Sequence, residues 1–198
     1  MEEPRVDGVD VLACQSCPEL CASRSRIVNG VGPTDADLLF VGEAPGAQED
    51  QQGEPFVGRS GDVLDDALRD RGLDRTDVRI TNCVRCRPPD NRDPKKAELE
   101  NCRPHLHREI ELVDPAVIVT LGKVPSEHLL DRSVAVTSEA GELADARIDG
   151  TPRRILVCVH PAATLYDPSQ QETFEAALDT AVDLIDDSEG GQARIADF

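Results

Sequence analysis

Apolar residues occur along the chain in short continuous runs, which Gly, Pro, Asn and charged residues interrupt. Runs of this length are typical of strands that are buried on both faces of a parallel sheet. We expect four such strands, at 38–41, 78–84, 116–121 and 154–159.

Longer segments between these runs carry apolar residues three and four positions apart, which is the spacing of one face of a helix. Helices are expected at 61–72, at 95–113 and at about 169–187. Because strands alternate with helices, the pattern predicts an α/β fold around a mostly parallel four-stranded sheet. Residues 133–152 predict only a weak hairpin or an irregular connection.

Polar and glycine-rich segments follow the predicted strands, at the sheet edge where parallel sheets bind their ligands. The first strand runs into residues 42–61, a loop with five glycines and two prolines. The second strand ends at Asn82 and the fourth at His160. Each feature alone also has a structural explanation, namely a solvated loop, a turn-capping Asn and a His that satisfies backbone groups. Their convergence on one edge predicts a functional site there.

The composition favours one folded domain. With 198 residues, 39% of them hydrophobic, the chain can bury one sizeable core, so we take 1–198 as a single domain with a flexible tail from about 189. No apolar run is long enough to span a membrane, and the first residues lack the pattern of a signal peptide. A cytoplasmic location is therefore expected.

The formal net charge of −18 ordinarily argues against a nucleic-acid partner, because phosphates are bound by Lys and Arg. Acidic residues spread along the whole chain, with only 3% aromatic residues, predict instead a halophilic protein that stays in solution at high salt. Residues 85–108 are an exception, since they hold seven of the 21 Lys and Arg residues. This basic segment is either a phosphate-contact surface or a salt-bridged helix face.

Seven cysteines in a reducing compartment predict metal binding, reactivity or burial rather than disulfides. Four of them come from two distant segments and predict one metal cluster, either zinc or iron–sulfur. These four are Cys14 and Cys17, in the N-terminal cysteine segment 14–21, together with Cys86 and Cys102. Cys21 is a fifth candidate, whereas Cys83 and Cys158 lie in predicted strands and are expected to be buried as small apolar residues.

Three segments, in this order, resemble the family 4 uracil-DNA glycosylases, a thermostable iron–sulfur family: GEAPGAQEDQQGEPFVGRSG (42–61), ITNCVRCRPPDNRDP (80–94) and HPAA (160–163). The resemblance implies a three-layer sandwich. It also implies a DNA repair enzyme that hydrolyses the N-glycosidic bond of uracil and leaves an abasic site, the first step of base excision repair. The implied partner is uracil-containing DNA, single- or double-stranded, whose target base must be flipped out of the stack. We expect a monomer, and no segment identifies a contact with a sliding clamp.

The resemblance assigns base recognition to three side chains and one stretch of backbone. Phe56 stacks on the flipped uracil, and the backbone around Gly42 to Gly46 shapes the floor of its pocket. Asn82 pairs with the polar edge of the base, which distinguishes uracil from cytosine. His160 donates a hydrogen bond to the uracil O2 as negative charge builds on the leaving base.

The same resemblance assigns the chemistry of water and sugar to two carboxylates. Glu43 and Glu49 activate or position water and stabilise the cationic sugar, with their roles undivided, and Asn91 orients Glu49. For the four cysteines named above, the resemblance favours a structural [4Fe-4S] cluster over zinc. The cluster braces the DNA-facing loops, because hydrolysis needs no redox step.

Two other interpretations are consistent with the motifs. One is a related glycosylase that prefers hypoxanthine or only mismatched uracil, although Asn82 favours uracil. The other is a non-catalytic iron–sulfur module that binds nucleic acid or senses redox state. Such a module would bind DNA without releasing a base, and the presence of two acidic candidates with Asn82 and His160 argues against it.

Overall fold

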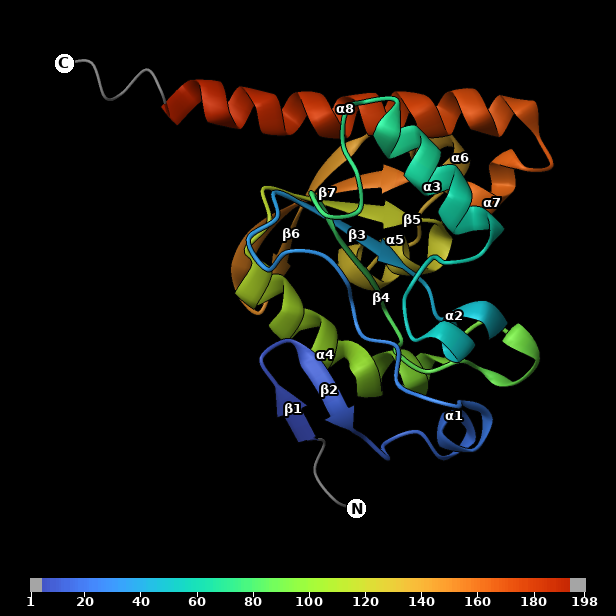
Figure 1. Ribbon diagram of the computed structural model, residues 1–198. Coiled ribbons are helices and arrows are strands. Elements are labelled where there is room, and N and C mark those ends of the chain that lie inside the picture. The colour runs from blue at the N-terminus through green and yellow to red at the C-terminus, as the bar shows by residue number, and fades with distance from the viewer. Residues whose placement is uncertain (1–4, 193–198) are drawn as a thin grey trace.

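A central sheet of five strands organises the fold, in the computed structural model that describes residues 5–192 (Figure 1). Its spatial order is β4-β3-β5-β7-β6, in which β4, β3, β5 and β7 are parallel. The bounds are β3 Leu38–Gly42, β4 Arg79–Asn82, β5 Val117–Leu121, β6 Leu143–Ile148 and β7 Thr151–Cys158. The four parallel strands are those that the apolar runs predict.

The fifth strand corrects the expected strand count. β6 pairs with β7 as an antiparallel hairpin, so the weak hairpin considered for residues 133–152 is a regular edge of the sheet. Asp149 and Gly150 form its turn with φ angles of 48° and 83°. Two successive positive φ angles are the requirement of a type I′ turn, which favours this dipeptide.

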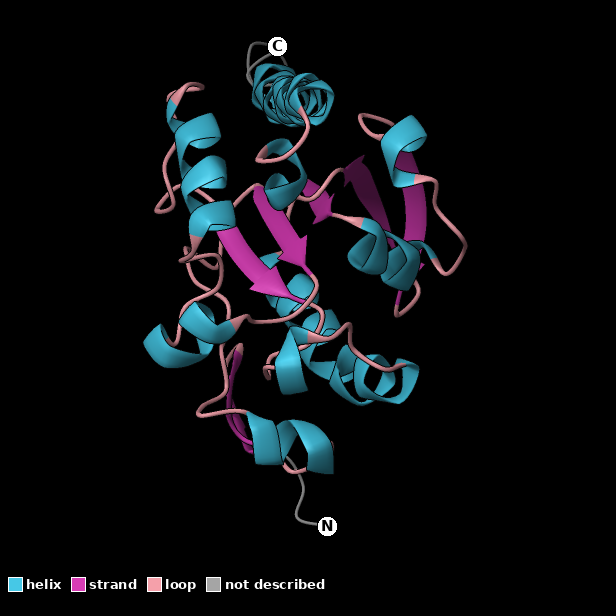
Figure 2. Ribbon diagram, turned by 90° about the vertical axis from the view of Figure 1, so that its right-hand side faces the viewer, coloured by secondary structure: helices cyan, strands magenta, loops and turns pink. Residues whose placement is uncertain are grey.

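Helices cover both faces of the sheet and make a three-layer sandwich, which confirms the expected α/β class (Figure 2). On one face Phe40 and Val119 pack against the apolar stripes of α3 and α8. On the other, Leu39 and Ile118 pack against α4 and α5. The helices are α1 Pro18–Ser23, α2 Ala47–Gln52, α3 Arg59–Arg69, α4 Lys96–Val113, α5 Lys123–Leu130, α6 Val136–Glu139, α7 Pro161–Thr164 and α8 Pro168–Gln192, with a 3-10 turn at Pro89–Asn91.

An N-terminal hairpin lies beside α4 (Figure 1). It consists of β1 (Arg5–Asp7) and β2 (Asp10–Ala13), which the sequence pattern does not reveal. Arg85 donates to the carbonyl of Val9 at 2.8 Å, and Arg108 of α4 donates to the carbonyl of Gly8 at 2.7 Å. These bonds join the hairpin to the domain just before the cysteine segment begins.

A buried ion network fixes β4 to α4. Glu109 is fully buried and accepts hydrogen bonds from Arg79 at 2.7 Å and from Arg85 at 2.6 Å. Removing one partner of such a network leaves an unpaired buried charge, so these residues act as a unit.

No helix among the described residues is long and apolar enough to cross a bilayer. The tail expected from about 189 lies largely outside the described residues, since α8 continues to Gln192 and the structure describes nothing beyond it.

Candidate active site

A cavity of about 200 Å³ opens at the carboxyl ends of the parallel strands. Five of the side chains expected to function together line it: Glu43, Glu49, Phe56, Asn82 and His160. They come from the segments after β3 and β7 and from the last residue of β4, so the sheet topology assembles the site from residues far apart in sequence. This is the edge at which open α/β sheets bind ligands.

Phe56 forms an aromatic wall of this cavity. Its ring stacks with that of His160, with centroids 5.8 Å apart and planes 28° apart. The ring lies so close to Gly42 that a Cβ built there would overlap both the ring and Asn82 Oδ1. Gly42 therefore leaves room for the Phe56 ring and the Asn82 amide because it has no side chain.

His160 presents one defined hydrogen-bond donor. Its Nδ1 accepts from the backbone N–H of Ala162 at 3.1 Å, so the proton of the neutral ring lies on Nε2. Burial lowers the pKa of His160 below its usual 6.5, although the charge of Glu49 opposes this shift. The imidazole is therefore neutral near pH 7 and has an Nε2–H available as a donor.

Asn82 has an unused amide. The residue is only 4% exposed and lines the cavity, yet none of the described residues hydrogen-bonds its side chain. Buried polar side chains nearly always have a partner, and one that faces a cavity is available to a ligand. Its donor and acceptor lie side by side, as recognition of a base edge requires.

Glu49 is held rigidly from the backbone. Its Oε2 accepts from the N–H of Gly46 at 3.1 Å, and its Oε1 accepts from those of Val57 and Gly58 at 3.1 and 3.2 Å. Gly46 is the N-cap of α2, so the start of this helix and the loop after it together orient the carboxylate.

Glu43 lies in a different electrostatic environment. Burial raises its pKa to about 7, and the neighbouring carboxyl of Asp93, which hydrogen-bonds Glu43, contributes to the rise. A carboxyl group whose pKa is near 7 can both accept and hold a proton at physiological pH. The site thus contains two carboxyl groups in contrasting surroundings, the usual arrangement for acid–base chemistry.

Asn91 does not reach this cavity, contrary to the expectation that it orients Glu49. It follows Asp90 in the 3-10 turn, where both residues have positive φ angles, and its side chain is exposed and accepts a hydrogen bond from Arg87 at 2.8 Å. The three backbone N–H groups described above take the place of Asn91 at Glu49.

Ala44 and Gly46, from the stretch of backbone expected to shape the pocket floor, also line the cavity, and so does Ser60. Ser60 was not singled out from the sequence, and its place in the glycine-rich segment 42–61 was its only signal. Asp93 was also missed, because its contact with Glu43 bridges two segments fifty residues apart.

The cysteines expected to bind metal lie in one part of the fold. Cys86 and Cys102 pack in one apolar cluster with Leu20, and Cys17 packs against it. Among the described residues no group of three or more His, Cys, Asp or Glu side chains stands in metal-binding geometry. Burial raises the pKa of Cys86 to about 11 and that of Cys102 to about 12, so a bound metal would have to displace their protons.

Hydrogen-bond donors point at two of the sulfur atoms, an arrangement that tunes metal-bound thiolates. Arg24 donates to Cys86 Sγ at 2.8 Å, and Asn101 donates to Cys17 Sγ at 3.4 Å. The chemistry of the donor set therefore fits a thiolate-bound cluster, although the described thiols do not stand in coordinating geometry. Cys21 lies close enough to Cys17 and Cys86 to affect their pKa values, so it remains a neighbour of this group.

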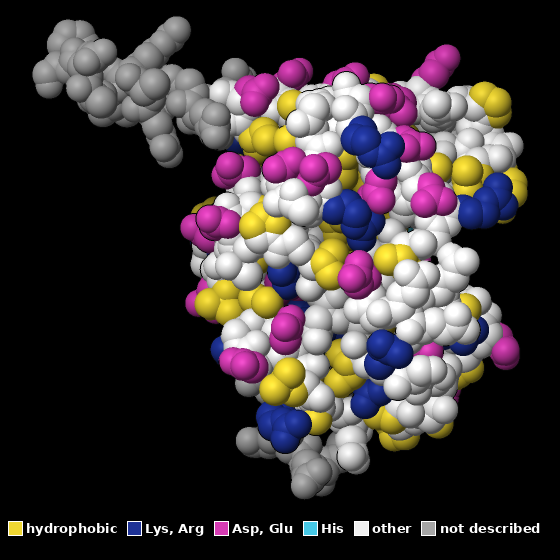
Figure 3. Space-filling model, viewed as in Figure 1, with side chains coloured by type: hydrophobic (Ala, Val, Ile, Leu, Met, Phe, Trp, Pro, Cys, Tyr) yellow, Lys and Arg dark blue, Asp and Glu magenta, His cyan; other side chains and the backbone are white. Residues whose placement is uncertain are grey.

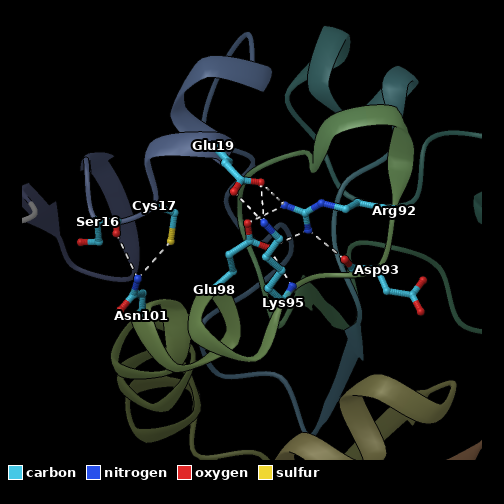
Figure 4. Close-up of polar contacts among 8 residues, drawn as sticks. All are labelled: Ser16, Cys17, Glu19, Arg92, Asp93, Lys95, Glu98 and Asn101. Atoms are coloured by element: carbon cyan, nitrogen blue, oxygen red, sulfur yellow. Dashed lines mark hydrogen bonds and ion pairs between the residues drawn. The ribbon is translucent and has the colours of Figure 1, made fainter.

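An ion network ties the cysteine segment to the loop before α4 (Figure 4). Arg92 pairs with Glu98 at 2.7 Å and with Glu19 of α1 at 3.1 Å, and Lys95 pairs with Glu19 at 2.6 Å. Arg92 also donates to the carbonyl of Asp93, whose carboxylate points away from the network in Figure 4. The network thus joins α1 to the segment that contacts Glu43.

These contacts argue against the interpretation of residues 85–108 as a phosphate-contact surface. Arg85 is buried against Glu109, Arg92 and Lys95 are paired as above, and Arg103 pairs with Glu100 at 3.1 Å. The other interpretation, a salt-bridged face, describes most of this segment. Some of the acids that pair with these residues lie within the segment, such as Glu98 and Glu100, and others lie outside it, at Glu19 and Glu109.

Comparison with known proteins agrees with this geometry. The sequence model of the uracil DNA glycosylase superfamily matches residues 29–182, and the chain belongs to this superfamily. Within it the chain belongs with the type-4 enzymes. It is 40% identical to the type-4 uracil-DNA glycosylase of Archaeoglobus fulgidus, over 84% of this chain and 85% of the relative. It is 39% identical to that of Thermotoga maritima, over 81% and 82%. A type-5 uracil-DNA glycosylase of Pyrobaculum aerophilum is 30% identical over 87% and 86%.

Proposed function

We propose that this protein hydrolyses the N-glycosidic bond of uracil in DNA, as the first step of base excision repair. One observation carries the proposal: a small cavity combines an aromatic wall, an unused amide and a neutral imidazole N–H, from Phe56, Asn82 and His160. These are the groups needed to hold a flat base with polar edges. A cavity of this size takes a base only after it leaves the helical stack.

Recognition and departure of the base follow from the same groups. The flipped uracil stacks on Phe56, and the Asn82 amide pairs with its polar edge. Cytosine has a donor where uracil has O4, so a fixed amide leaves buried groups unmatched with the wrong base. As the bond between N1 and C1′ breaks, its electrons pass to the uracil ring, and the His160 Nε2–H stabilises the charge at O2.

The carboxylates serve the sugar and the water. Glu49, fixed by three backbone N–H groups, is placed to stabilise positive charge on the sugar and to orient water. Glu43, with its pKa near 7, takes a proton as the water oxygen bonds to C1′. This division of roles extends the sequence-based assignment, which left the two carboxylates equivalent.

The direct test uses a single-stranded oligonucleotide with one uracil, and base release is read as alkali-labile cleavage. We expect cleavage of this DNA and none of a matched cytosine strand. If a base were released only from hypoxanthine-containing DNA, the substrate would be hypoxanthine and not uracil. Tight DNA binding without any release would favour a non-catalytic binding module instead.

We further propose a halophilic, cytoplasmic protein that acts as a monomer, since one chain supplies every residue of the cavity. Acidic side chains gather over α8 and α3 on the face shown in Figure 3. At about 1 M salt the screening length falls to about 3 Å, so distant acids repel DNA little. The uracil assay should therefore retain its activity in molar potassium chloride, and an enzyme inhibited there would not be halophilic.

We also propose that Cys14, Cys17, Cys86 and Cys102 bind a [4Fe-4S] cluster. Cys17, Cys86 and Cys102 gather in one cluster, and Cys14 lies close enough to affect the pKa of each of them. N–H donors directed at two of these thiols also support the assignment. When bound, the cluster joins the cysteine segment to the start of α4 and supplies no step of the hydrolysis. Its role is to brace the loops that face DNA.

Replacing a cluster ligand should remove iron. Cys86→Ser and Cys102→Ser are expected to lose most iron and sulfide, with the visible absorbance of the cluster, and to unfold at a lower temperature. Cys158→Ala is the control, because Cys158 is also a buried cysteine but lies in β7, away from the other four. Its iron content should match that of the unaltered protein. Full iron in Cys86→Ser, or zinc in the unaltered protein, would contradict the assignment.

A further inference from the structure

Phe56 occupies a backbone conformation that it does not favour. Its φ angle is 53°, in the left-handed region that side chains with a Cβ rarely adopt. Such a conformation persists only where the surroundings hold it, and these positions gather at functional sites. The structure shows which residues hold Phe56.

Arg75, in the loop between α3 and β4, binds two successive backbone carbonyls at this position. Its guanidinium donates to the carbonyl of Pro55 at 2.6 Å and to that of Phe56 at 2.8 Å. Asp65 of α3 fixes the guanidinium through an ion pair at 2.9 Å. The planar guanidinium fits two carbonyls at once in a fixed geometry, which the rotatable ammonium of Lys does not reproduce.

Close packing from α3 completes the support. A Cβ built at Gly61 would overlap the carbonyl oxygen of Phe56, so the helix approaches this bend as closely as a glycine allows. With its backbone held in this way, the Phe56 ring packs over Gly42 and stacks with His160. A small rotation of the bend would displace the aromatic wall and with it the neighbouring imidazole.

We propose that Arg75 is a positioning residue that holds Phe56 as the stacking wall for the flipped base. The proposal rests on the function proposed above and deepens it, since it identifies what fixes the base-binding face. Arg75 does not line the cavity and touches no reacting atom. It acts through two carbonyls, so no motif at the cavity reveals it.

Arg71 provides a matched control four residues earlier in the chain. It also donates to two carbonyls, those of Ala67 and Glu175, each at 2.8 Å, and it pairs with Glu175 and Asp179. These contacts join the end of α3 to α8, and none of them involves Phe56 or Pro55. Arg71→Lys therefore reports the effect of weakening a comparable arginine anchor without moving the cavity wall.

The test compares Arg75→Lys with Arg71→Lys in the full protein. Thermal unfolding and the single-turnover rate of uracil release are measured for each, with the dissociation constants for two DNAs. One DNA carries a non-hydrolysable uracil nucleotide, and the other carries an abasic site, which puts no base against Phe56. The rate should fall roughly 10- to 100-fold in Arg75→Lys, because a misplacement of about 1 Å can lower a rate about 100-fold.

Affinity for the uracil analogue should fall in Arg75→Lys while affinity for abasic DNA is unchanged. In Arg71→Lys the ratio of the two affinities should stay as in the unaltered protein, whatever the loss of thermal stability. If Arg75→Lys does not fold, Asp65→Asn loosens the same guanidinium and should shift the ratio in the same direction. An unchanged ratio in the folded variant would overturn the proposal, whereas failure of the unaltered protein to release uracil would overturn the function instead.

Discussion

Replacing His160 with alanine should lower the rate of uracil release by roughly 100- to 1,000-fold, the effect of removing one preorganised donor to a developing oxyanion. The imidazole is already neutral and has its Nδ1 occupied by Ala162, so its Nε2–H needs no reorganisation during bond cleavage. The loss should appear in the single-turnover rate, with affinity for abasic DNA retained.

Two comparisons sharpen this result. His107→Ala is a suitable control, because His107 lies on α4 and contacts Asp149 away from the cavity. Its rate should be unchanged. A His160→Ala enzyme that keeps its rate within a few-fold would show that another group stabilises the leaving base, and would remove His160 from the mechanism.

The second large effect concerns Glu43 and pH. If Glu43 must be ionised to take a proton from water, the rate should rise with pH and level off above about 7, the value to which burial and Asp93 raise its pKa. Below that value the carboxyl is protonated, and the rate should fall about tenfold per pH unit. Glu43→Gln should lose roughly 100- to 10,000-fold at pH 8 and lose this dependence.

Asp93→Asn tests the cause of the raised pKa. The substitution removes a neighbouring carboxylate, so the pKa of Glu43 should fall and the rise in rate should move to lower pH. Glu54→Gln changes an exposed residue in the segment 42–61, which also contains Glu43, and should leave the dependence of the rate on pH unaltered. A rate that is constant from pH 5.5 to 8.5 would exclude Glu43 as the base, and an unmoved Asp93→Asn profile would leave burial as the sole cause.

Much of this site can be predicted from sequence because its residues occupy defined places in a simple topology. Each apolar run ends at a strand end, and parallel strands bring their carboxyl ends together, so Asn82 and His160 had to lie near the loop after β3. The fifth strand, β6, was not predicted because it alternates exposed and half-buried residues over most of its length and carries charges. The Asp149-Gly150 dipeptide was the available signal for its hairpin.

The residues that position the site could not be predicted from the sequence, for a physical reason. Arg75 and Asp93 act through contacts across 19 and 50 residues of sequence, and such contacts depend on how loops pack. Neither residue has a local pattern that distinguishes it from a solvated charge. Asn91 shows the converse, since its motif was clear but the turn at Asp90 directs its side chain to Arg87.

The two outer strands of the sheet bear on self-association at high protein concentration. Unpaired strand edges are templates for pairing with another chain. The outer edge of β4 is occupied by Val31, whose backbone exchanges two hydrogen bonds of 2.9 Å with Ile80. On β6, Asp145 and Arg147 present charged side chains to solvent. Neither edge offers a long apolar template, so crowding should not drive edge-to-edge aggregation.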